Sequence, residues 1–552
     1  MGETGVSYKN IDILKKSFVS LKKPLKSLNH KIFIRDTLLL SSAAASTLDK
    51  VGSAHNLKKI DIPLYYKQNM DKLLIENYDL FKNYAMQDSL ITLVHGLFMN
   101  DFNFRLGSTI LPNTLGGISS LYICKKWASD GYKGYQVHPN YPLGDAQKSC
   151  TPRGVTSLGF TGEVLNFFLG AFRGGRNECF TYGIDNHTRW YDYDLSSCYS
   201  TVMSLCGEPD YSKASYVDPD TPIYKFNESY AAVRVKFKFP DCIKYPPLPV
   251  NLDSNLIIYP LEGETLVTGI EYLTACKLLN NVLSKTPIKK GYYIKIISGV
   301  YIPFKKDGYY PFKNVISELQ RMRRLYPKKS SMERIYKDLC NMLYGKVVCG
   351  ISDKRNYNSR IRTMISMKGN NIANPIIGSW ITGFVRSLLT EILNKIDSMG
   401  GKICSVTTDG FVTNLKNLES LIVKENSYLF NRLKILKSQS IILSLYSEIH
   451  NIKPSYSFIK VDNRIVTDTK LFTFIEHDNT YYTLIGPTYY HLRSPSTASL
   501  KTEFLVKPTP KFLARDNSHP NFKGKYNKLY NKLYFFEKEL LSVHNNLNII
   551  KN

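Results

Sequence analysis

Apolar and polar residues alternate with different periods along the chain, and these periods predict its elements. Residues 230–305 alternate with a period near two and are interrupted by prolines, which predicts strands and turns. Residues 311–345 and 376–398 show a helical period instead. Residues 454–490 again favour strands. Residues 95–170 are rich in Gly and Pro and are expected to form loops packed on short elements.

Both ends of the chain are basic. Residues 1–95 mix basic, helix-like runs with a Ser/Ala stretch at 41–46. From Lys523 onward, Tyr526-Asn527-Lys528-Leu529 is followed by Tyr530-Asn531-Lys532-Leu533. This period of four predicts a basic helix in the tail.

Two aspartates lie inside apolar, strand-like runs about two hundred residues apart. Asp194 follows Trp190-Tyr191-Asp192-Tyr193 and is expected at the end of a strand. Asp409 follows an apolar run and precedes Gly410, which predicts a hairpin with Asp409 at its tip. Each aspartate alone is more typical of a turn. Together they suit two-metal nucleotidyl transfer, because Mg²⁺ binds one or two carboxylates plus substrate phosphates.

The helix predicted between these aspartates carries a polar face. Lys337, Asn341 and Tyr344 lie at i, i+4 and i+7 and therefore share one side of it. A lysine in this place can pair with a triphosphate, and a tyrosine can pack on a base. Basic residues precede the helix at Arg321, Arg323, Arg324, Lys328 and Lys329. A solvated basic helix is the alternative interpretation.

The charge of the chain strengthens the case for a nucleic-acid partner. The 552 residues predict two to four domains. A net charge of +27 favours a polyanionic partner, nucleic acid first and an anionic membrane second. The 39 tyrosines offer faces on which bases can stack. An AT-rich coding genome would explain the abundance of Lys, Asn, Ile and Tyr, but not by itself the charge imbalance.

The cysteines and the apolar runs argue against several other classes of protein. No two of the ten cysteines are spaced C-x-x-C, so no zinc site is expected, and the pattern suits a reducing compartment. No apolar run reaches the roughly 18 residues that a membrane span needs. The segment Met1-Gly2-Glu3-Thr4 resembles neither a signal peptide nor an Arg-rich transit peptide.

In their order along the chain, three segments resemble motifs A, B and C of the family B DNA polymerases. They are Asp194-Leu195-Ser196-Ser197-Cys198-Tyr199-Ser200, then Lys337-x-x-x-Asn341-x-x-Tyr344-Gly345, then Thr407-Thr408-Asp409-Gly410. More narrowly, the chain resembles the terminal-protein-primed branch. Polymerases of phages, adenoviruses and linear plasmids of fungal and plant mitochondria belong to that branch.

Five shorter elements add to the resemblance. Phe172-Arg173-Gly174-Gly175-Arg176 is similar to the branch's Tyr-x-Gly-Gly element, and Thr382-Gly383-Phe384-Val385-Arg386 is similar to its Thr-x-x-Ala/Gly-Arg element. Lys470-Leu471-Phe472 lies where the family has Lys-x-Tyr. Tyr84-Ala85-Met86-Gln87-Asp88 resembles the third exonuclease motif, and Thr47-Leu48-Asp49-Lys50-Val51 resembles an element that contacts single strands or terminal protein.

The resemblance implies an α+β fold in the shape of a right hand, with palm, fingers and thumb. It also implies a DNA-directed DNA polymerase that adds dNTPs to a 3′-hydroxyl on primed template DNA with two Mg²⁺ or Mn²⁺ ions. Asp194 and Asp409 would be the catalytic metal ligands. The nucleotide would be bound by Tyr199, which also excludes a 2′-hydroxyl, and by Lys337, Asn341 and Tyr344. DNA would be contacted by Thr47, Leu48, Gly174, Gly175, Thr382, Arg386 and Lys470.

Of the places where the chain departs from the family pattern, two bear on the expected activities. Thr407 stands where the family has the first Asp of Asp-Thr-Asp, so a lower metal affinity is expected. The first two exonuclease motifs do not occur before residue 84. Tyr84 and Asp88 would therefore be the remnant of a truncated RNase H-like exonuclease domain, and 3′–5′ exonuclease activity is expected to be absent.

The same resemblance predicts six domains and a set of partners. Residues 1–95 would be the exonuclease remnant, 96–200 and 376–495 the palm, 201–310 a terminal-protein-region insertion, 311–375 the fingers with a second insertion, and 496–552 the thumb. A terminal protein is the expected partner besides DNA and dNTPs, and no membrane is expected. A mitochondrial location is expected from the resemblance to linear-plasmid polymerases.

Three alternatives remain open. Reverse transcriptases and single-subunit RNA polymerases also use two palm aspartates, but a reverse transcriptase would have paired aspartates where this chain has Thr408-Asp409. An inactive polymerase remnant or basic single-strand-binding protein would explain Thr407 and the missing exonuclease motifs. A chain that only binds terminal protein is the third alternative.

Overall fold

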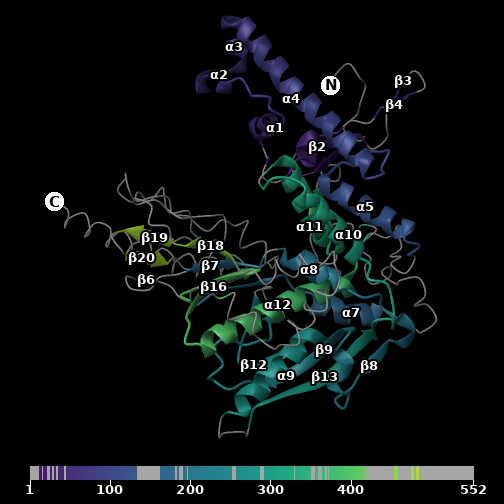
Figure 1. Cartoon of the computed structure of the whole chain (residues 1–552), viewed down its shortest axis with the longest axis vertical. Helices are drawn as coiled ribbons and strands as arrows, with labels where there is room; N and C mark the ends of the chain where they lie inside the picture. The colour runs from purple at the N-terminus through teal and green to yellow at the C-terminus, as the bar shows by residue number, and fades with distance from the viewer. Residues whose placement is uncertain are drawn as a thin grey trace, which may run out of the picture. The chain divides into compact units, whose positions relative to one another are not determined.

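The chain divides into two compact units, each described here by itself (Figure 1). One unit comprises Met1–Thr156 and Tyr309–Asn374, and the other comprises Ser157–Gly308 and Pro375–Asn552. The computed structural model describes residues 11–14, 17–21, 25–27, 30–32, 35–42, 45, 47–132, 162–180, 183–185, 191–195, 197–251, 257–285, 291–328, 330–349, 355–358, 363–366, 370, 372–415, 418, 453–457, 474–477 and 480–483.

In the first unit, α11 (Ser331–Val347) packs on α5 (Leu115–Ser129) and α10 (Lys313–Arg324), as Figure 1 shows. The side chain of Ser330 caps α11 by accepting from the amide of Glu333. Ile335, Leu339 and Leu343 are buried along one side of α11. Both α10 and α11 confirm the helical period of residues 311–345.

The N-terminal part of this unit is more varied than predicted. Short strands pair as two hairpins, β1 (Ile11–Leu14) with β2 (Ser17–Leu21) and β3 (Leu25–Ser27) with β4 (His30–Ile32). The helix-like interpretation is therefore wrong for these residues and holds after them. The helices are α1 (Leu48–Ala54), α2 (Leu64–Gln68), α3 (Met70–Glu76) and α4 (Tyr78–Arg105), preceded by a 3₁₀ turn at Thr37–Leu40.

Near the C-terminal end of the same unit, another hairpin joins β14 (Arg355–Asn358) and β15 (Thr363–Ser366).

The loop prediction for residues 95–170 is wrong at the end of α4, at α7 (Gly162–Ala171) and at α5. The N-cap of α5 is Thr114, whose side chain accepts from the amide of Gly117. Gly116 and Gly117 therefore lie in the first turn of a helix rather than in a loop. Packing decides the outcome, because Ile118 and Ile123 are buried and the Ser119 hydroxyl donates to the carbonyl of Leu339 in α11 over 2.7 Å.

The second unit contains a five-stranded antiparallel sheet in the order β18-β7-β17-β16-β5. The strands are β5 (Arg176–Cys179), β7 (Tyr191–Asp194), β16 (Ile403–Thr408), β17 (Gly410–Thr413) and β18 (Lys453–Ser457). The predicted strand before Asp194 and the predicted hairpin around Asp409 are both confirmed. The hairpin of β16 and β17 lies between β5 and β7, so neighbours in this sheet are far apart in sequence.

A second antiparallel sheet follows the order β12-β9-β13-β8. Its strands are β8 (Ser215–Val217), β9 (Ser229–Lys238), β12 (Glu262–Thr268) and β13 (Tyr293–Pro303). Val233, Val235 and Phe237 of β9 are buried, whereas Arg234 and Lys236 between them are exposed. This alternation confirms the strand prediction for 230–305, except that α9 (Gly269–Leu283) interrupts it as a helix.

The helix α12 (Pro375–Ser398) joins the elements of the second unit, and it confirms the helical period of residues 376–398. It packs on α7 (Gly162–Ala171), α8 (Cys198–Ser204) and α9, and on strands of both sheets (Figure 1). Within the described part of the chain, α12 is the one helix long and apolar enough to cross a membrane. However, 94% of its most apolar window is buried inside the protein, as in a core helix.

Shorter pairings complete the second unit, namely β10 (Val250–Asn251) with β11 (Ile257–Ile258), and β19 (Phe474–His477) with β20 (Thr480–Thr483) and β6 (Gly183–Asp185). The described strands within 454–490 agree with the prediction there. The tail from Lys523 and the thumb at 496–552 lie outside the described residues. The α+β class is confirmed, whereas the six domain boundaries stay predictions, and the two units divide the range 96–200.

Candidate active site

The two predicted catalytic aspartates lie at the same end of neighbouring strands. In the ladder between β7 and β17, Asp194 is opposite Gly410, the residue after Asp409. The amide of Leu195 donates to the carbonyl oxygen of Asp409 over 2.9 Å. Asp409 is half-buried at the tip of its hairpin. The fold thus brings together two carboxylate-bearing positions that are about two hundred residues apart in sequence.

The turn that carries Asp409 is tight and strained. Thr407 pairs with Gly410, which leaves Thr408 and Asp409 as the two residues of the turn. Thr408 has φ of 57°, a region that a β-branched residue rarely adopts. The amide of Asp409 donates to the carbonyl of Thr407 over 2.5 Å, the hydrogen bond of a γ-turn. Such backbone strain persists only where the surrounding structure imposes it.

The segment Gly174–Asn177 supplies that surrounding structure on one side of the turn. Asn177 pairs with Thr407 in the ladder between β5 and β16. Its side-chain amide donates to the carbonyl of Gly175 over 3.1 Å, and its carbonyl oxygen accepts from the Thr408 hydroxyl over 3.3 Å. A Cβ at Gly175 would lie 2.8 Å from the Cα of Thr408, whereas a Cβ at Gly174 would meet open space. Gly175 therefore allows the loop to approach the turn closely.

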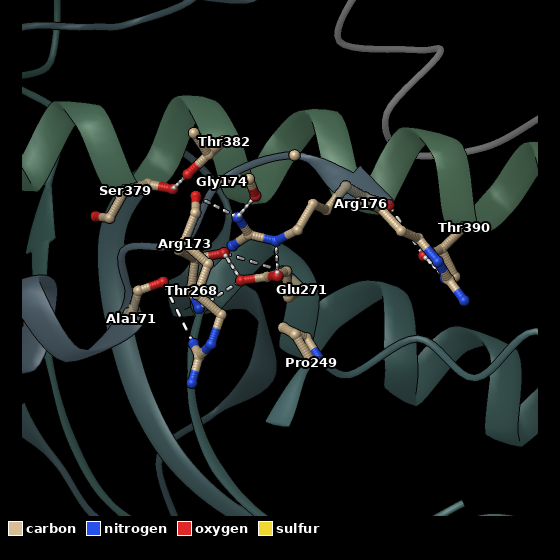
Figure 2. Close-up of polar contacts among 12 residues, drawn as sticks. Ala171, Arg173, Gly174, Arg176, Pro249, Thr268, Glu271, Ser379, Thr382 and Thr390 are labelled. Carbon is tan, nitrogen blue, oxygen red and sulfur yellow. Dashed lines mark hydrogen bonds and ion pairs between the residues drawn. The ribbon is translucent and has the colours of Figure 1, made fainter. Parts of the chain in front are cut away.

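A buried arginine on α12 holds the same loop. The guanidinium of Arg386 donates to the carbonyl oxygens of Arg173 and Gly174 over 2.7 and 2.8 Å. It also forms an ion pair with Glu271 at 2.7 Å, and both side chains are almost fully buried. Figure 2 shows Glu271 beside Thr268, with Gly174 above them. Burial opposes the charge on Arg386, but the facing carboxylate outweighs it, so the pKa of Arg386 is raised.

Glu271 owes its position to the start of α9. The Thr268 side chain accepts from the amide of Glu271, and the Glu271 carboxylate accepts from the amide of Thr268 over 3.0 Å, which together form a capping box. Burial opposes ionisation of Glu271, but the Arg386 guanidinium prevails and the pKa of Glu271 is lowered. The carboxylate is thus satisfied by its own helix N-terminus and by a cation on α12.

Arg176 fastens the other end of the loop to α12. Its guanidinium donates to the Thr390 hydroxyl over 3.1 Å (Figure 2). It also donates to the carbonyl of Pro246 over 3.0 Å. It pairs with Glu178 at 2.5 Å and lies 3.9 Å above the centre of the Tyr259 ring. The Arg176 side chain that makes these contacts is 0% exposed. Arg176 is therefore part of the interior rather than of a DNA-binding surface.

Arg173 is anchored in the opposite direction, toward β12. It donates to the hydroxyl of Thr265 over 3.1 Å and to the carbonyl of Leu266 over 2.5 Å. Burial lowers the pKa of Arg173 to about 10. The loop Arg173–Gly174–Gly175–Arg176 is therefore fixed at both ends by buried arginine side chains, and its Gly175 lies next to the turn of Asp409.

The predicted nucleotide-binding face of α11 belongs to the first unit. Lys337 and Asn341 are exposed and Tyr344 is half-buried, on the side away from the buried Leu339 and Leu343. This arrangement confirms that the three polar residues share one side of a helix. Their role toward a nucleotide stays a prediction.

Residues 159–380 match the family model described as DNA polymerase type B, organellar and viral. The matched range includes the Gly174–Gly175 loop, Asp194 and the polar face of α11. In this range the chain is similar to family B of the DNA polymerases.

Individual known proteins are also similar to parts of this chain. The primer-independent DNA polymerase PolB of Escherichia coli is 27% identical over 399 residues, which are 69% of this chain and 44% of that protein. The chain thus spans less than half the length of this relative. Phi29 DNA polymerase with primer-template DNA and incoming nucleotide gives a TM-score of 0.46 at 15% identity, over 73% of this chain and 65% of that one. The family B polymerase of Pyrobaculum calidifontis gives 0.33 at 14% identity, over 80% and 44%.

The positions of the two aspartates fit divalent ions. The backbone brings two carboxylate-bearing residues, Asp194 and Asp409, to the same end of neighbouring strands, and Mg²⁺ or Mn²⁺ favours hard oxygen ligands of this kind together with substrate phosphates. Thr407, where the family has a third carboxylate, is 6% exposed within the ladder. Two residues of this chain would therefore hold the ions.

The predicted exonuclease remnant lies on α4. Tyr84 and Asp88 are one turn apart, and both contact Lys59. The Lys59 ammonium is 2.9 Å from the Asp88 carboxylate and 4.9 Å from the centre of the Tyr84 ring. Burial opposes the charge on Lys59, but its contacts with Tyr84 and Asp88 raise its pKa. Asp88 thus forms an ion pair with Lys59, and its assignment as an exonuclease remnant stays a prediction.

The remaining predicted contact residues have different surroundings. Thr47 caps α1 by accepting from the amide of Lys50, and Leu48 opens that helix. Thr382 and Arg386 each have 0% exposure, so neither side chain reaches a surface where it could touch DNA. Lys470 lies outside the described residues. Tyr199 on α8 is half-buried and near enough to Arg386 to contribute to its raised pKa.

Glu271 and Asn177 are contact residues that the sequence analysis missed. Both act through contacts with distant parts of the chain, which one sequence does not reveal. A partial signal existed for Glu271, because Thr268-x-x-Glu271 before an apolar run is the pattern of a capping box.

Proposed function

We propose that the chain is a DNA-directed DNA polymerase that adds deoxynucleotides to a 3′-hydroxyl with two divalent ions. The observation that supports this most directly is the backbone pairing that brings Asp194 beside the hairpin tip at Asp409 in a chain similar to family B polymerases. The net charge of +27 suits a DNA template and primer.

In the proposed reaction, the 3′-hydroxyl oxygen forms a bond to the α-phosphorus of a dNTP. The bond from that phosphorus to the bridging oxygen of the β-phosphate breaks, pyrophosphate leaves, and the hydroxyl proton passes to solvent. Divalent ions bound at the two carboxylates would supply neutralisation of the charge that develops on the transferring phosphate.

The chain's own residues would orient the reactants. Asp194 and Asp409 would fix the reaction centre at one end of β7 and β17, two inner strands of the five-stranded sheet. Lys337 would bind the triphosphate, and Asn341 and Tyr344 would contact the nascent pair from the same side of α11. Tyr199, half-buried on the helix that follows β7, would exclude a 2′-hydroxyl.

Two modes of starting synthesis are compatible with the family. The motif resemblance favours a terminal protein that offers the first hydroxyl, in replication of a linear plasmid or viral-like genome in a mitochondrion. The name of the Escherichia coli relative favours a second candidate, synthesis that needs no primer. These modes differ in what the purified chain does on a template that carries no primer.

Primer extension with Mg²⁺ or Mn²⁺ tests the proposed activity. The parent chain is expected to extend a primer, and Asp194→Asn and Asp409→Asn should each retain below about one-thousandth of its rate. Asp220→Asn, which alters an exposed aspartate in the turn after β8, serves as the matched control and should extend normally.

Two results would contradict the proposal. One is extension at the parental rate by both aspartate variants. The other is a parent chain that binds single strands but extends none, which would favour a basic single-strand-binding protein. Product from an unprimed template, without any added protein, would select primer-independent initiation over a terminal protein.

A further inference from the structure

Glu271 lies outside every motif that carries the family resemblance, yet it is the only carboxylate described in contact with Arg386. Its exposed fraction is 1% and that of Arg386 is 0%. A buried charge is costly unless it is paired and hydrogen-bonded. This pair meets that condition, because each partner makes further hydrogen bonds to fixed backbone groups.

The pair of Glu271 and Arg386 is connected through further contacts to the hairpin of β16 and β17. The ion pair with Glu271 fixes the Arg386 guanidinium, because any other position of this group would break the pair. Arg386 in turn binds the carbonyl oxygens of Arg173 and Gly174. The next residue, Gly175, is packed against the backbone of Thr408.

The approach of α12 to α9 leaves this arrangement little freedom. A Cβ at Gly383, one turn before Arg386, would lie 2.2 Å from the hydroxyl oxygen of Thr268. Thr268 is the N-cap residue that also binds Glu271. The capping box and the helix that carries Arg386 are therefore in direct contact, so the carboxylate is positioned by both helices.

We propose that Glu271 is a positioning residue for nucleotide transfer, acting through Arg386 on the turn that carries Asp409. This inference rests on the proposed function and adds a residue from the segment between motifs A and B. Glu271 touches neither substrate nor metal. It keeps the Arg173–Gly174 carbonyls in place, and these hold Gly175 against Thr408.

The test compares Glu271→Gln with Glu262→Gln. Glutamine keeps the size of Glu271 and can still accept from the Thr268 amide, but it removes the charge. Glu262 is a matched control because it lies in β12, the strand that precedes α9. It pairs with Lys238 on the surface, and 57% of its side chain is exposed. Steady-state extension gives kcat and KM, and hydrogen exchange reports on residues 172–180 and 404–413.

We expect Glu271→Gln to lower kcat by about 100-fold, as for a misplacement of the reacting groups by about 1 Å. KM for the dNTP should stay within about twofold of the parental value, because nucleotide binding is not altered. Exchange should become faster in both segments and stay unchanged in α10 and α11. Parental kcat in the variant, or a lower kcat without faster exchange in these two segments, would overturn the proposal.

A second variant separates positioning from folding. Glu271→Met combined with Arg386→Met removes both buried charges and keeps comparable volume, a change that is often neutral for folding. This folded double variant should still lack the hold on Gly174 and should show the same loss of kcat. If it extends at the parental rate, the ion pair serves folding alone and the proposal fails. If the parent itself extends no primer, the proposed function fails, and the exchange rates alone decide whether Glu271 holds the loop.

Discussion

The amide of Leu195 donates a hydrogen bond of 2.9 Å to the carbonyl oxygen of Asp409, so the residue after one aspartate is bound to the other aspartate's own peptide group. This contact couples the positions of Asp194 and Asp409 through the backbone. Changes in the turn of the hairpin are therefore expected to shift the backbone at both Asp194 and Asp409.

The two glycines of the loop should differ in their tolerance of a side chain. Gly175→Ala places a methyl group 2.8 Å from the Cα of Thr408, so the loop or the turn must shift. Overpacking of this kind costs about 1–3 kcal/mol of unfolding free energy, and kcat should fall about tenfold to 100-fold as the turn moves. Gly174→Ala meets open space and should change the unfolding free energy by less than about 0.5 kcal/mol. Equal destabilisation of the two variants in urea unfolding would contradict this prediction.

Restoring a carboxylate at position 407 should trade stability for metal affinity. Thr407 is 6% exposed and lies between β5 and β17, so Thr407→Asp buries a charge close to Asp409. With a chelator present, the variant should lose about 1–3 kcal/mol of unfolding free energy. Titration of primer extension with Mg²⁺ should show half-maximal rate at roughly tenfold lower concentration. An unchanged or higher Mg²⁺ requirement would show that position 407 does not face the ions.

Two substitutions at Thr408 should separate the effect of its backbone strain from that of its hydrogen bond to Asn177. Thr408→Gly relieves a positive φ that costs a β-branched residue about 1–3 kcal/mol, against an entropic cost of glycine of about 0.5–1 kcal/mol. Thermal unfolding should therefore show a gain of about 1 kcal/mol, while extension slows because the turn loosens. Thr408→Ser keeps the hydroxyl that Asn177 accepts from and should stay near the parental rate. A faster Thr408→Gly enzyme would mean that the strained turn does not assist the reaction.

The buried His95 and its half-buried neighbour His55 predict acid sensitivity in the first unit. His95 lies between His55, at 3.0 Å, and the Ser41 hydroxyl, at 2.9 Å. Because Ser41 donates to the carbonyl of Thr37, His95 donates to Ser41 through Nε2 and accepts from His55 through Nδ1. Burial lowers the pKa of His95 to about 4, and His55 adds to this effect. A second proton on His95 would set two donors against each other.

The unfolded chain binds a proton at His95 near pH 6.5, whereas the folded chain binds it only near pH 4. The contribution of neutral His95 to the unfolding free energy is therefore fully present above pH 6.5. It decreases by roughly 3 kcal/mol as the pH falls from 6.5 to 4. Hydrogen exchange in α4 at pH 6.5 and 4.5 would measure this. His95→Gln, which does not titrate, should show a smaller change between the two pH values. The same change in both proteins would assign the acid sensitivity to other groups.

The sequence predicts local features of the site well and tertiary contacts poorly. The strand before Asp194, the hairpin at Asp409 and the shared face of Lys337, Asn341 and Tyr344 all depend on short-range periodicity, and the structure confirms each one. The loop predicted at residues 115–129 is wrong because packing of α5 on α11 outweighs the two glycines in its first turn.

The arginines illustrate what short patterns miss. Arg386 resembles a DNA-contacting residue by its motif, yet its side chain is fully buried against Glu271, which lies 115 positions earlier in the chain. Neither composition nor local spacing reveals that partner. The motif therefore identified a residue near the site, and only the fold shows that its guanidinium faces the interior.

The order of the five-stranded sheet has a consequence for the newly made chain. β5 and β7 are synthesised early, but in the finished sheet they do not pair with each other, because the β16–β17 hairpin lies between them. The edges of β5 and β7 that will pair with this hairpin stay unpaired until the ribosome has added more than two hundred further residues. The pairing that joins Asp194 and Asp409 is thus formed late during translation, and the exposed edges of β5 and β7 are where a nascent chain is most open to aggregation and to chaperone binding.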